Sequence, residues 1–231
     1  MLNSEEEMFE YVKRFGRMHY AKLASAFSEP FPQCFCGKVN IVDWGCGQAL
    51  ATIAFIEKYG DACVDRITLV EPSEIVLKRA ALHCHKFAPN AKIRTLNKKL
   101  DDLILDDFRE SSSNITIHLF SNILDIDDYH PRLFRSLVDA VRSIGDYFVC
   151  VSPYIDDVKT QRIASFCNYF RDKDSFVRYH DIMCSKKDEF WMCNNSYKKE
   201  FLGHGSYTNC SSSDERGCSN KWTRVIKVFS V

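Results

Sequence analysis

The sequence predicts an α/β protein with a doubly wound, mostly parallel sheet. Short apolar stretches alternate with segments of helical periodicity from about residue 38 to residue 170. A glycine turn, Gly45-Cys46-Gly47, joins the first apolar stretch to the first of these helices. The last two apolar stretches, Ser175–Met183 and Trp222–Val231, have no convincing helix between them. They therefore predict an antiparallel strand pair at the end of the chain.

The remaining elements follow one another in a regular order. The apolar stretches predict strands at Val39–Asp43, Arg66–Val70, Lys92–Leu96, Asn114–Phe120 and Asp146–Val151. The periodic segments between and after them predict helices at Ala49–Tyr59, Pro72–Phe87, Pro131–Ile144 and Thr160–Phe170. Proline is favoured in the first turn of a helix, which supports the start at Pro72. Strands that alternate with helices of this length indicate parallel pairing.

The chain divides into two predicted parts, a helical cap with a linker at 1–37 and a sheet domain at 38–231. Apolar residues at near-helical spacing in the first part are Phe9, Val12, Phe15, Tyr20, Leu23 and Phe27. Pro30, Pro32 and Gly37 then mark the linker. Residues 184–221 are polar and rich in Ser, Asn and Gly. They predict an irregular insertion between the last two strands.

Length and charge limit the classes of function. The chain has 231 residues with 31 Lys and Arg and 31 Asp and Glu, so its net charge is zero. This balance argues against a general electrostatic attraction to nucleic acid or to an anionic membrane. The N-terminus lacks the apolar core of a signal peptide, and no apolar run approaches the roughly 18–20 residues of a membrane span. We therefore expect a cytoplasmic protein that does not bind membranes.

The eleven cysteines are odd in number and scattered along the chain, which predicts free thiols in a reducing compartment. One group is a candidate metal site: Cys184, Cys193, Cys210 and Cys218. The spacings between them match no standard zinc knuckle. We expect no metal in this protein.

The glycine turn predicts a ligand site. Glycine has no Cβ and tolerates positive φ, so the backbone at Gly45 and Gly47 can approach a ligand closely. The helix that follows offers free N–H groups at its N-terminus. Glu71 ends the second strand, about two dozen residues after Gly47, where an adenosine ribose presents its hydroxyls. A tight structural turn is the alternative explanation for the glycines.

Asp43 distinguishes between nucleotide ligands. The G-x-G-x-x-G pattern of dinucleotide sites is incomplete, because Leu50 stands where its third glycine would be. Asp43, two residues before Gly45, is poorly placed for a pyrophosphate. A carboxylate at this point suits a positively charged ligand group, such as the amino or sulfonium group of S-adenosylmethionine.

This arrangement resembles the class I (Rossmann-like) S-adenosylmethionine-dependent methyltransferases over roughly residues 38–231. The matching residues are Asp43-x-Gly45-x-Gly47, Glu71, and the phrase Phe120-Ser121-Asn122-Ile123-Leu124 after the fourth strand. The resemblance implies a Rossmann-like sheet with an antiparallel C-terminal pair and N-terminal helices. It also implies S-adenosylmethionine as the cofactor. The family's third glycine is replaced by Ala49, which is a mild change.

The resemblance also implies roles for individual residues. Those expected on the methionine side of the cofactor are Asp43, Gly45, Cys46 and Gly47. Glu71 is expected to bind the ribose and Pro72 to pack near the base. Ser121 and Asn122 are expected to face the methyl group and the substrate, although a plain polar strand end is the alternative. Lys99-Leu100 stand where the family's acid commonly meets the adenine amino group, and Asp101 is expected to take that role through a shifted turn.

The methyl acceptor stays open at this point, as does catalysis itself. No catalytic residue is assigned, because the cofactor brings most of the driving force and the protein mainly aligns the reactants. The N-terminal helices and the insertion are expected to form lids over the acceptor pocket. Their aromatic and basic residues suit either RNA or a small aromatic acceptor. His19 is expected at the surface beside a packed Tyr20, and the alternative is that His19-Tyr20 caps the cofactor pocket. The alternative functions are a non-catalytic adenosine-ligand binding protein and a nucleotide-dependent oxidoreductase.

Overall fold

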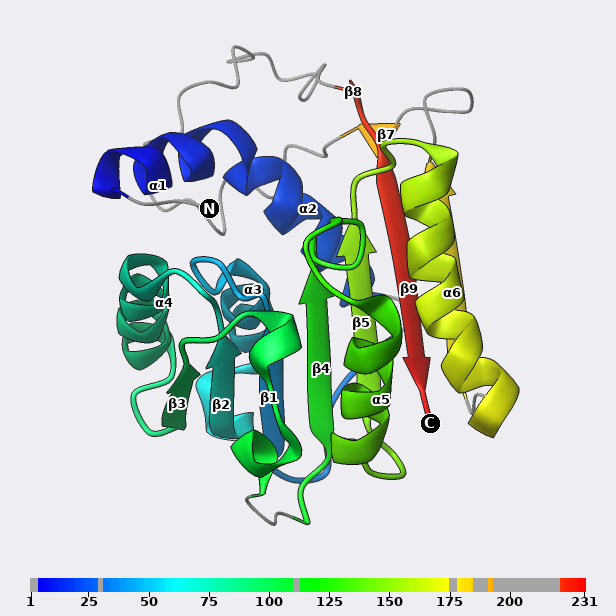
Figure 1. Ribbon diagram of the computed structural model, residues 1–231. Coiled ribbons are helices and arrows are strands. Elements are labelled where there is room, and N and C mark those ends of the chain that lie inside the picture. The colour runs from blue at the N-terminus through cyan, green and yellow to red at the C-terminus, as the bar shows by residue number, and fades with distance from the viewer. Residues whose placement is uncertain (1–3, 29–30, 110–112, 175–177, 185–190, 193–220) are drawn as a thin grey trace.

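The protein is built around one twisted seven-stranded sheet with the strand order β3-β2-β1-β4-β5-β9-β6 (Figure 1). The computed structural model describes residues 4–28, 31–109, 113–174, 178–184, 191–192 and 221–231. The five strands from β3 to β5 pair in parallel, and β9 pairs antiparallel with both β5 and β6. The doubly wound, mostly parallel sheet with an antiparallel C-terminal pair is therefore confirmed.

The strand bounds agree closely with the predicted ones. The sheet consists of β1 (Val39–Trp44), β2 (Val64–Val70), β3 (Lys92–Leu96), β4 (Thr116–Ser121), β5 (Tyr147–Ser152), β6 (Arg178–Cys184) and β9 (Arg224–Ser230). A separate two-stranded sheet pairs β7 (Trp191–Met192) with β8 (Lys221–Trp222). Most of the predicted insertion, 184–221, lies outside the described residues, so its irregular structure stays a prediction.

The crossover helices lie where the periodicity predicts them. They are α3 (Leu50–Tyr59), α4 (Glu74–Phe87), α5 (Pro131–Val141) and α6 (Asp157–Asp174). In the described residues between β3 and β4 the helices are the short 3-10 turns η3 (Leu100–Asp102) and η4 (Leu105–Phe108), and η2 (Asp61–Cys63) precedes β2. None of the described helices combines the length and the apolar composition that a membrane crossing needs.

The N-terminal segment is one continuous run of helix with a wider π turn in its middle. It consists of α1 (Glu5–Tyr11), the π segment η1 (Val12–Gly16) and α2 (Arg17–Ala26). In Figure 1 it crosses the upper end of the sheet, above the carboxyl ends of the parallel strands. Parallel α/β sheets bind their ligands at this edge. Whether residues 1–37 form a unit separate from 38–231 stays a prediction.

Two apolar clusters cover the two faces of the sheet. One packs α2, α3 and α4 against one set of strand residues, including the fully buried Ile41, Leu69 and Leu119. The other packs α5 and α6 against the alternate residues, including Trp44 and Phe120. The alternation follows from the two-residue period of a strand, which turns successive side chains to opposite faces. Strands buried on both faces explain the continuous apolar runs in the sequence.

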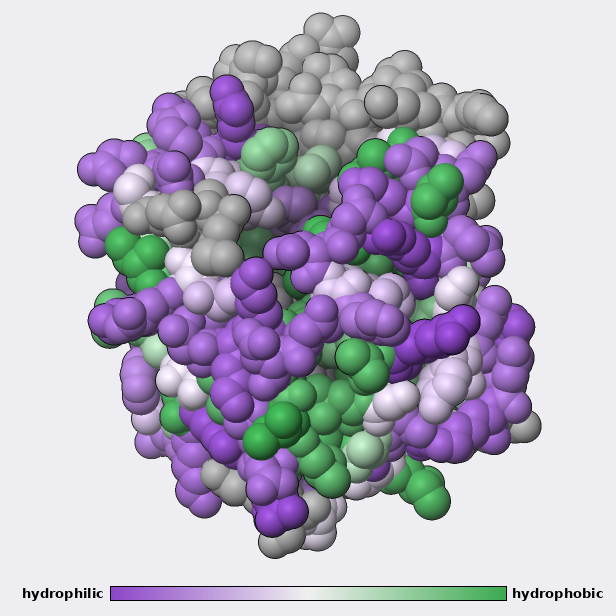
Figure 2. All heavy atoms as spheres, in the orientation of Figure 1, coloured by the Kyte–Doolittle hydropathy of each residue, from purple (hydrophilic) through white to green (hydrophobic). Residues whose placement is uncertain are grey.

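The surface over η4 and α5 is less polar than the rest of the visible face. Figure 2 shows a hydrophobic area in its lower part, where Figure 1 shows these two elements. Exposed apolar side chains of this region include Ile104, Leu105 and Leu133, each about half exposed or more. The 3-10 helices cover the sheet with fewer apolar residues than a full crossover helix provides.

Candidate functional site

The turn between β1 and α3 has an open left-handed backbone at three positions. Gly45 and Gly47 have φ values of 65° and 50°, and Ala49 has 64°. A Cβ on Gly45 would come within 2.5 Å of the Ile123 side chain, whereas one on Gly47 would meet no protein atom within 4 Å. A side chain at position 45 would have to displace Ile123 and would stand on a strained backbone, so glycine is favoured there, and at position 47 glycine leaves space beside the backbone. The left-handed Ala49 stands at the family's third glycine position.

Glu71 lies directly against this turn. Its Oε2 accepts a hydrogen bond from the Gly47 N–H at 3.2 Å, and its Oε1 accepts one from the Ser73 N–H at 3.0 Å. Burial raises the pKa of the Glu71 carboxyl, and the two N–H donors oppose that shift. Glu71 thus connects the end of β2 to the glycine turn. Its remaining lone pairs are available to a ligand hydroxyl.

Asp43 is buried beneath the turn with only 1% of its surface exposed. Its Oδ2 accepts a hydrogen bond from the Thr52 hydroxyl at 2.7 Å, whereas its Oδ1 has no partner among the described residues. Burial raises the pKa of the Asp43 carboxyl to about 7, and the nearby Glu71 adds to this shift. An unpaired carboxylate oxygen at this depth suits a cationic group or a hydrogen-bond donor.

Ser121 and Asn122 end β4 beside the turn. Asn122 has a φ of 55°, and its N–H donates to the Val151 carbonyl at 2.7 Å. Asparagine tolerates this left-handed conformation better than most residues, and such backbone is common at functional sites. The Asn122 side chain donates to the Ser121 hydroxyl at 3.0 Å and accepts a hydrogen bond from Lys22.

A cavity of about 590 Å³ brings most of the predicted residues together. The predicted residues that line it are Gly45, Cys46, Gly47, Glu71, Ser121 and Asn122. Burial raises the pKa of the Cys46 thiol well above its ordinary value, so this cysteine is not a reactive thiolate. The volume is within the range of small-molecule and cofactor sites.

Asp43, Pro72 and Asp101 are not among the lining residues. Asp43 lies behind the turn, as described above. The Pro72 carbonyl accepts a hydrogen bond from the Asn97 side chain at 2.9 Å. The Asp101 carboxylate accepts the His130 N–H at 2.8 Å, which ties η3 to the start of α5. The predicted roles of Pro72 and Asp101 near the adenine stay predictions.

The N-terminal helix supplies the roof of the cavity, in line with the expectation that it forms a lid. Tyr11, Gly16 and His19 line it, and the Gln48 side chain joins the turn to the Met8 carbonyl at 2.9 Å. Tyr11 Oη lies 3.1 Å from His19 Nε2, and the two rings stack at 5.8 Å. The helix therefore closes the glycine turn from above.

His19 is buried at 7% exposure, so the expectation of a surface histidine was wrong. The tight packing of α2 against the sheet is the reason, because it turns this side of the helix inwards. Burial lowers the pKa of the imidazole to about 3, with the Lys22 charge adding to the shift. His19 is therefore neutral near pH 7, and its Nδ1 has no partner among the described residues.

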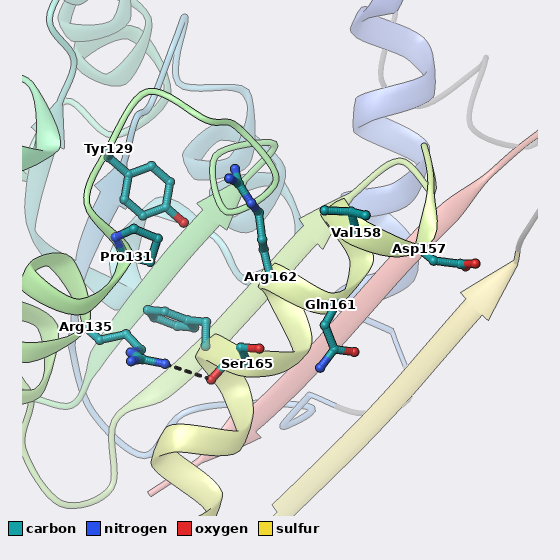
Figure 3. A pocket seen from close by; sticks show the side chains of 9 residues that line it. Tyr129, Pro131, Arg135, Asp157, Val158, Gln161, Arg162 and Ser165 are labelled. Atoms are coloured by element: carbon teal, nitrogen blue, oxygen red, sulfur yellow. Dashed lines mark hydrogen bonds between the residues drawn. The ribbon is translucent and has the colours of Figure 1, made fainter.

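A second cavity of about 620 Å³ lies between α5 and α6 (Figure 3). Its lining includes Tyr129, Arg135, Arg162 and Phe166 and contains none of the predicted site residues. Arg135 donates to the Ser165 carbonyl at 3.4 Å, and its buried Nε has no partner among the described residues. Because this cavity holds neither the glycine turn nor Glu71, it is not the nucleotide site.

A metal site is a separate question. Within the part of the chain that the structure describes, no group of three or more His, Cys, Asp or Glu side chains is arranged to hold a metal ion. This statement does not cover the side chains of Cys184, Cys193, Cys210 and Cys218, which lie outside the described part of the chain. Their lack of metal stays a prediction.

Comparison with solved structures identifies the fold. Geranyl diphosphate C-methyltransferase from Streptomyces coelicolor A3(2) is similar with a TM-score of 0.51 and 12% identity, over 98% of this chain and 82% of that one. A SAM-dependent O-methyltransferase from Thermotoga maritima also has a TM-score of 0.51, with 11% identity over 100% and 72% of the two chains. The chain has the class I methyltransferase fold.

At these identities the likeness extends to the fold and not to the substrate. The two methyltransferases carry different acceptors in their names, geranyl diphosphate in one case and an oxygen atom in the other. No family model matches the sequence, and no curated protein matches it. In the class I methyltransferase fold, function has to be argued from the site itself.

Proposed function

We propose that this protein binds S-adenosylmethionine in the 590 Å³ cavity and transfers its methyl group to an acceptor. The observation that supports this most is the position of the Glu71 carboxylate against the open Gly45–Gly47 turn, at the carboxyl edge of a class I methyltransferase sheet. A carboxylate there accepts hydrogen bonds from a ribose diol without any need for phosphate.

The residues fit this cofactor in three respects. The space beside Gly47, which a Cβ would occupy, permits close backbone approach. The unpaired Oδ1 of buried Asp43 suits the cationic end of the ligand better than a pyrophosphate. Glu71 adds a second acid, and no lysine or arginine is among the described residues that line the cavity. A site for a dinucleotide pyrophosphate would favour the opposite charge.

When bound, S-adenosylmethionine supplies a methyl group on a positively charged sulfur, which is a good leaving group. The chain's own residues bind and orient the cofactor. Glu71 holds the ribose end, the Gly45–Gly47 turn lies along the methionine end, and Asn122 faces the site of transfer at the end of β4. The roof formed by Tyr11 and His19 excludes water, which strengthens the polar interactions inside.

The binding prediction is direct. S-adenosylhomocysteine is expected to bind with a dissociation constant in the micromolar range, about −8 kcal/mol, and NAD is expected not to bind. Isothermal titration calorimetry measures both on the purified chain. Binding of NAD, with no heat from S-adenosylhomocysteine at millimolar concentration, would refute the proposal and favour an oxidoreductase.

Catalysis needs its own experiment, because a non-catalytic binding protein would pass the test above. Methyl-labelled S-adenosylmethionine is incubated with the protein and with cell extract separated into RNA and small-molecule fractions. Label transferred to one fraction identifies the acceptor class. A Glu71→Ala protein in parallel reactions reveals transfer by contaminating enzymes.

A further inference from the structure

Lys22 is the most deeply buried charged side chain on the N-terminal helix. It extends from α2 with 0% of its surface exposed. Its Nζ donates one hydrogen bond, to the Asn122 Oδ1 at 3.0 Å, and among the described residues this is the amine's single hydrogen bond. Nothing in the sequence motifs singles out this residue.

One neutral partner does not satisfy an ammonium group. A protonated lysine offers three N–H donors and a full charge, and burial without matching acceptors costs several kcal/mol. The neutral amine is therefore favoured. Burial accordingly lowers the pKa of Lys22 to about 7, against an opposing effect from the Asp125 carboxylate. A neutral lysine has a lone pair that accepts a proton.

The amine lies at the end of the cavity where methyl transfer is proposed. Asn122 both contacts Lys22 and lines the cavity, so a single side chain separates the Nζ from the ligand space. His19, one helical turn before Lys22, lines the same space. The left-handed backbone of Asn122, held by its N–H bond to Val151, directs this amide toward the helix.

The charged and titratable groups around Lys22 come from several elements. Those that interact with it electrostatically are His19 on α2 and Asp125 after β4. Asp125 is 4% exposed and accepts a hydrogen bond from the Ser152 hydroxyl of β5 at 2.9 Å. The others that border the cavity or lie beneath it are Tyr11 on α1, Asp43 on β1, Cys46 in the turn, Glu71 after β2 and His83 on α4.

We propose that Lys22 receives the proton which the methyl acceptor releases during transfer. This inference rests on the proposed function. The lone pair of the acceptor atom forms the new bond to the methyl carbon, and the carbon–sulfur bond breaks with its electron pair left on sulfur. The proton on the acceptor atom moves to the lone pair of the Lys22 Nζ. This step requires the Asn122 side chain, which now accepts a hydrogen bond from Nζ and separates it from the cavity, to turn away.

The charge of the buried site is then the same before and after the reaction. The sulfonium carries one positive charge beside a neutral amine at the start, and the ammonium carries it beside a neutral thioether at the end. The Asp125 carboxylate favours the protonated product state. The acceptor must therefore present an attacking atom that bears a proton, which is a hydroxyl or an amine and excludes a thioether or a tertiary amine.

The proposal is tested by how the ratio of the affinities for positively charged S-adenosylmethionine and for uncharged-sulfur S-adenosylhomocysteine changes with pH. A protonated Lys22 repels a sulfonium and not a neutral thioether. From pH 8.5 to pH 6, the affinity for S-adenosylmethionine is therefore expected to fall roughly 10- to 50-fold relative to that for S-adenosylhomocysteine. Calorimetry with both ligands measures the ratio. Lys22→Met should remove most of this change, while Lys58→Met, an exposed lysine on α3, should leave it intact.

Asp43 is the main competing group, because its pKa is also near 7 and its carboxylate attracts the sulfonium. Asp43→Asn removes that contribution and should leave the Lys22 part of the pH dependence. A direct measurement completes the design: protein with 13C-labelled lysine should show one side-chain resonance that titrates near pH 7 and disappears in Lys22→Met. Its pKa should fall in Asp125→Asn and fall when S-adenosylmethionine replaces S-adenosylhomocysteine.

The outcomes are distinguishable. If neither ligand binds, the proposed function is wrong and the inference falls with it. If both bind but Lys22 titrates near pH 10, or the ligand ratio changes equally in Lys22→Met, the cofactor site stands and Lys22 is only a structural tether for Asn122. If Lys22→Met does not fold, the proposal can still be refuted, because the titration of the lysine resonances is measured in the unaltered protein.

Discussion

Replacing Glu71 with alanine is expected to weaken S-adenosylhomocysteine binding roughly 30- to 1000-fold. Charge-assisted hydrogen bonds to the ribose hydroxyls contribute about 1.5–3 kcal/mol each, and water partly replaces them, which leaves a net loss of about 2–4 kcal/mol. The substitution also removes the acceptor for the Gly47 and Ser73 N–H groups, so the glycine turn is no longer held in its open form. Calorimetry measures the loss.

Two further variants separate these contributions. Glu71→Gln keeps an acceptor oxygen but not the charge, and an intermediate loss is expected. Glu74→Ala changes an exposed acid in the first turn of α4 that pairs with Lys78, so affinity should be nearly unaltered. The melting temperature of unliganded Glu71→Ala should move by only a few degrees. Wild-type affinity in this variant, or its outright unfolding, would show that Glu71 does not bind the ribose.

The sheet could be predicted because its signals are local and strong. Strands such as Tyr147–Ser152 are buried on both faces and are therefore almost continuously apolar in sequence. Element ends were less certain. The helix expected from Pro72 begins at Glu74, and the one expected to reach Ile144 ends at Val141. Terminal residues depend on capping contacts that the periodicity does not record.

The glycine turn could also be predicted, because glycine at two close positions indicates a backbone that other residues avoid. Gly45 and Gly47 both have positive φ, and Ala49 adopts the same conformation without the residue type that would indicate it. The meeting of Glu71 with this turn follows from the parallel pairing of β1 and β2, which sets their carboxyl ends side by side. Topology and local signals agree here.

The position of the N-terminal helix over the site could be predicted, but not which of its side chains face the cavity, because the π segment changes the phase of the helix. In a regular α-helix, Tyr11 and His19 would lie about 80° apart around the axis. The wider turn at Val12–Gly16 advances each residue by a smaller angle, so the two rings meet instead. The burial of Lys22 could not be predicted for a related reason: it depends on the docking of α2 onto the end of β4.

Asp101 shows that a residue can lie near the expected position in sequence and still contact a different part of the fold. The 3-10 turn η3 immediately after β3 takes its carboxylate to the backbone of His130. Only the path of the chain between β3 and η3 decides this. The adenine contact of Asp101 therefore stays a prediction that depends on its exchanging one partner for another.

Replacing Asp43 with asparagine is expected to remove a large pH dependence of stability. The folded pKa of Asp43 is about 7, above the ordinary value of 3.8, so the folded state retains a proton that the unfolded state loses. The Asp43 contribution is therefore fully present below about pH 4 and is lost as the pH rises to 7. The loss approaches about 4 kcal/mol above pH 7, from three units at about 1.4 kcal/mol each.

Urea unfolding of both proteins at pH 5, 6, 7 and 8 measures this effect. Asparagine still accepts the Thr52 hydroxyl bond through its carbonyl oxygen, but its amide N–H groups cost about 1–3 kcal/mol if they find no partner. Whatever the difference at pH 5, the unfolding free energy of Asp43→Asn should therefore rise steadily relative to that of the unaltered protein as the pH rises. Lys22 and Glu57, whose pKa values are also near 7, cancel in this difference. A constant difference would show that Asp43 is ionised throughout, and then its unpaired oxygen would already carry the charge that a cationic cofactor requires.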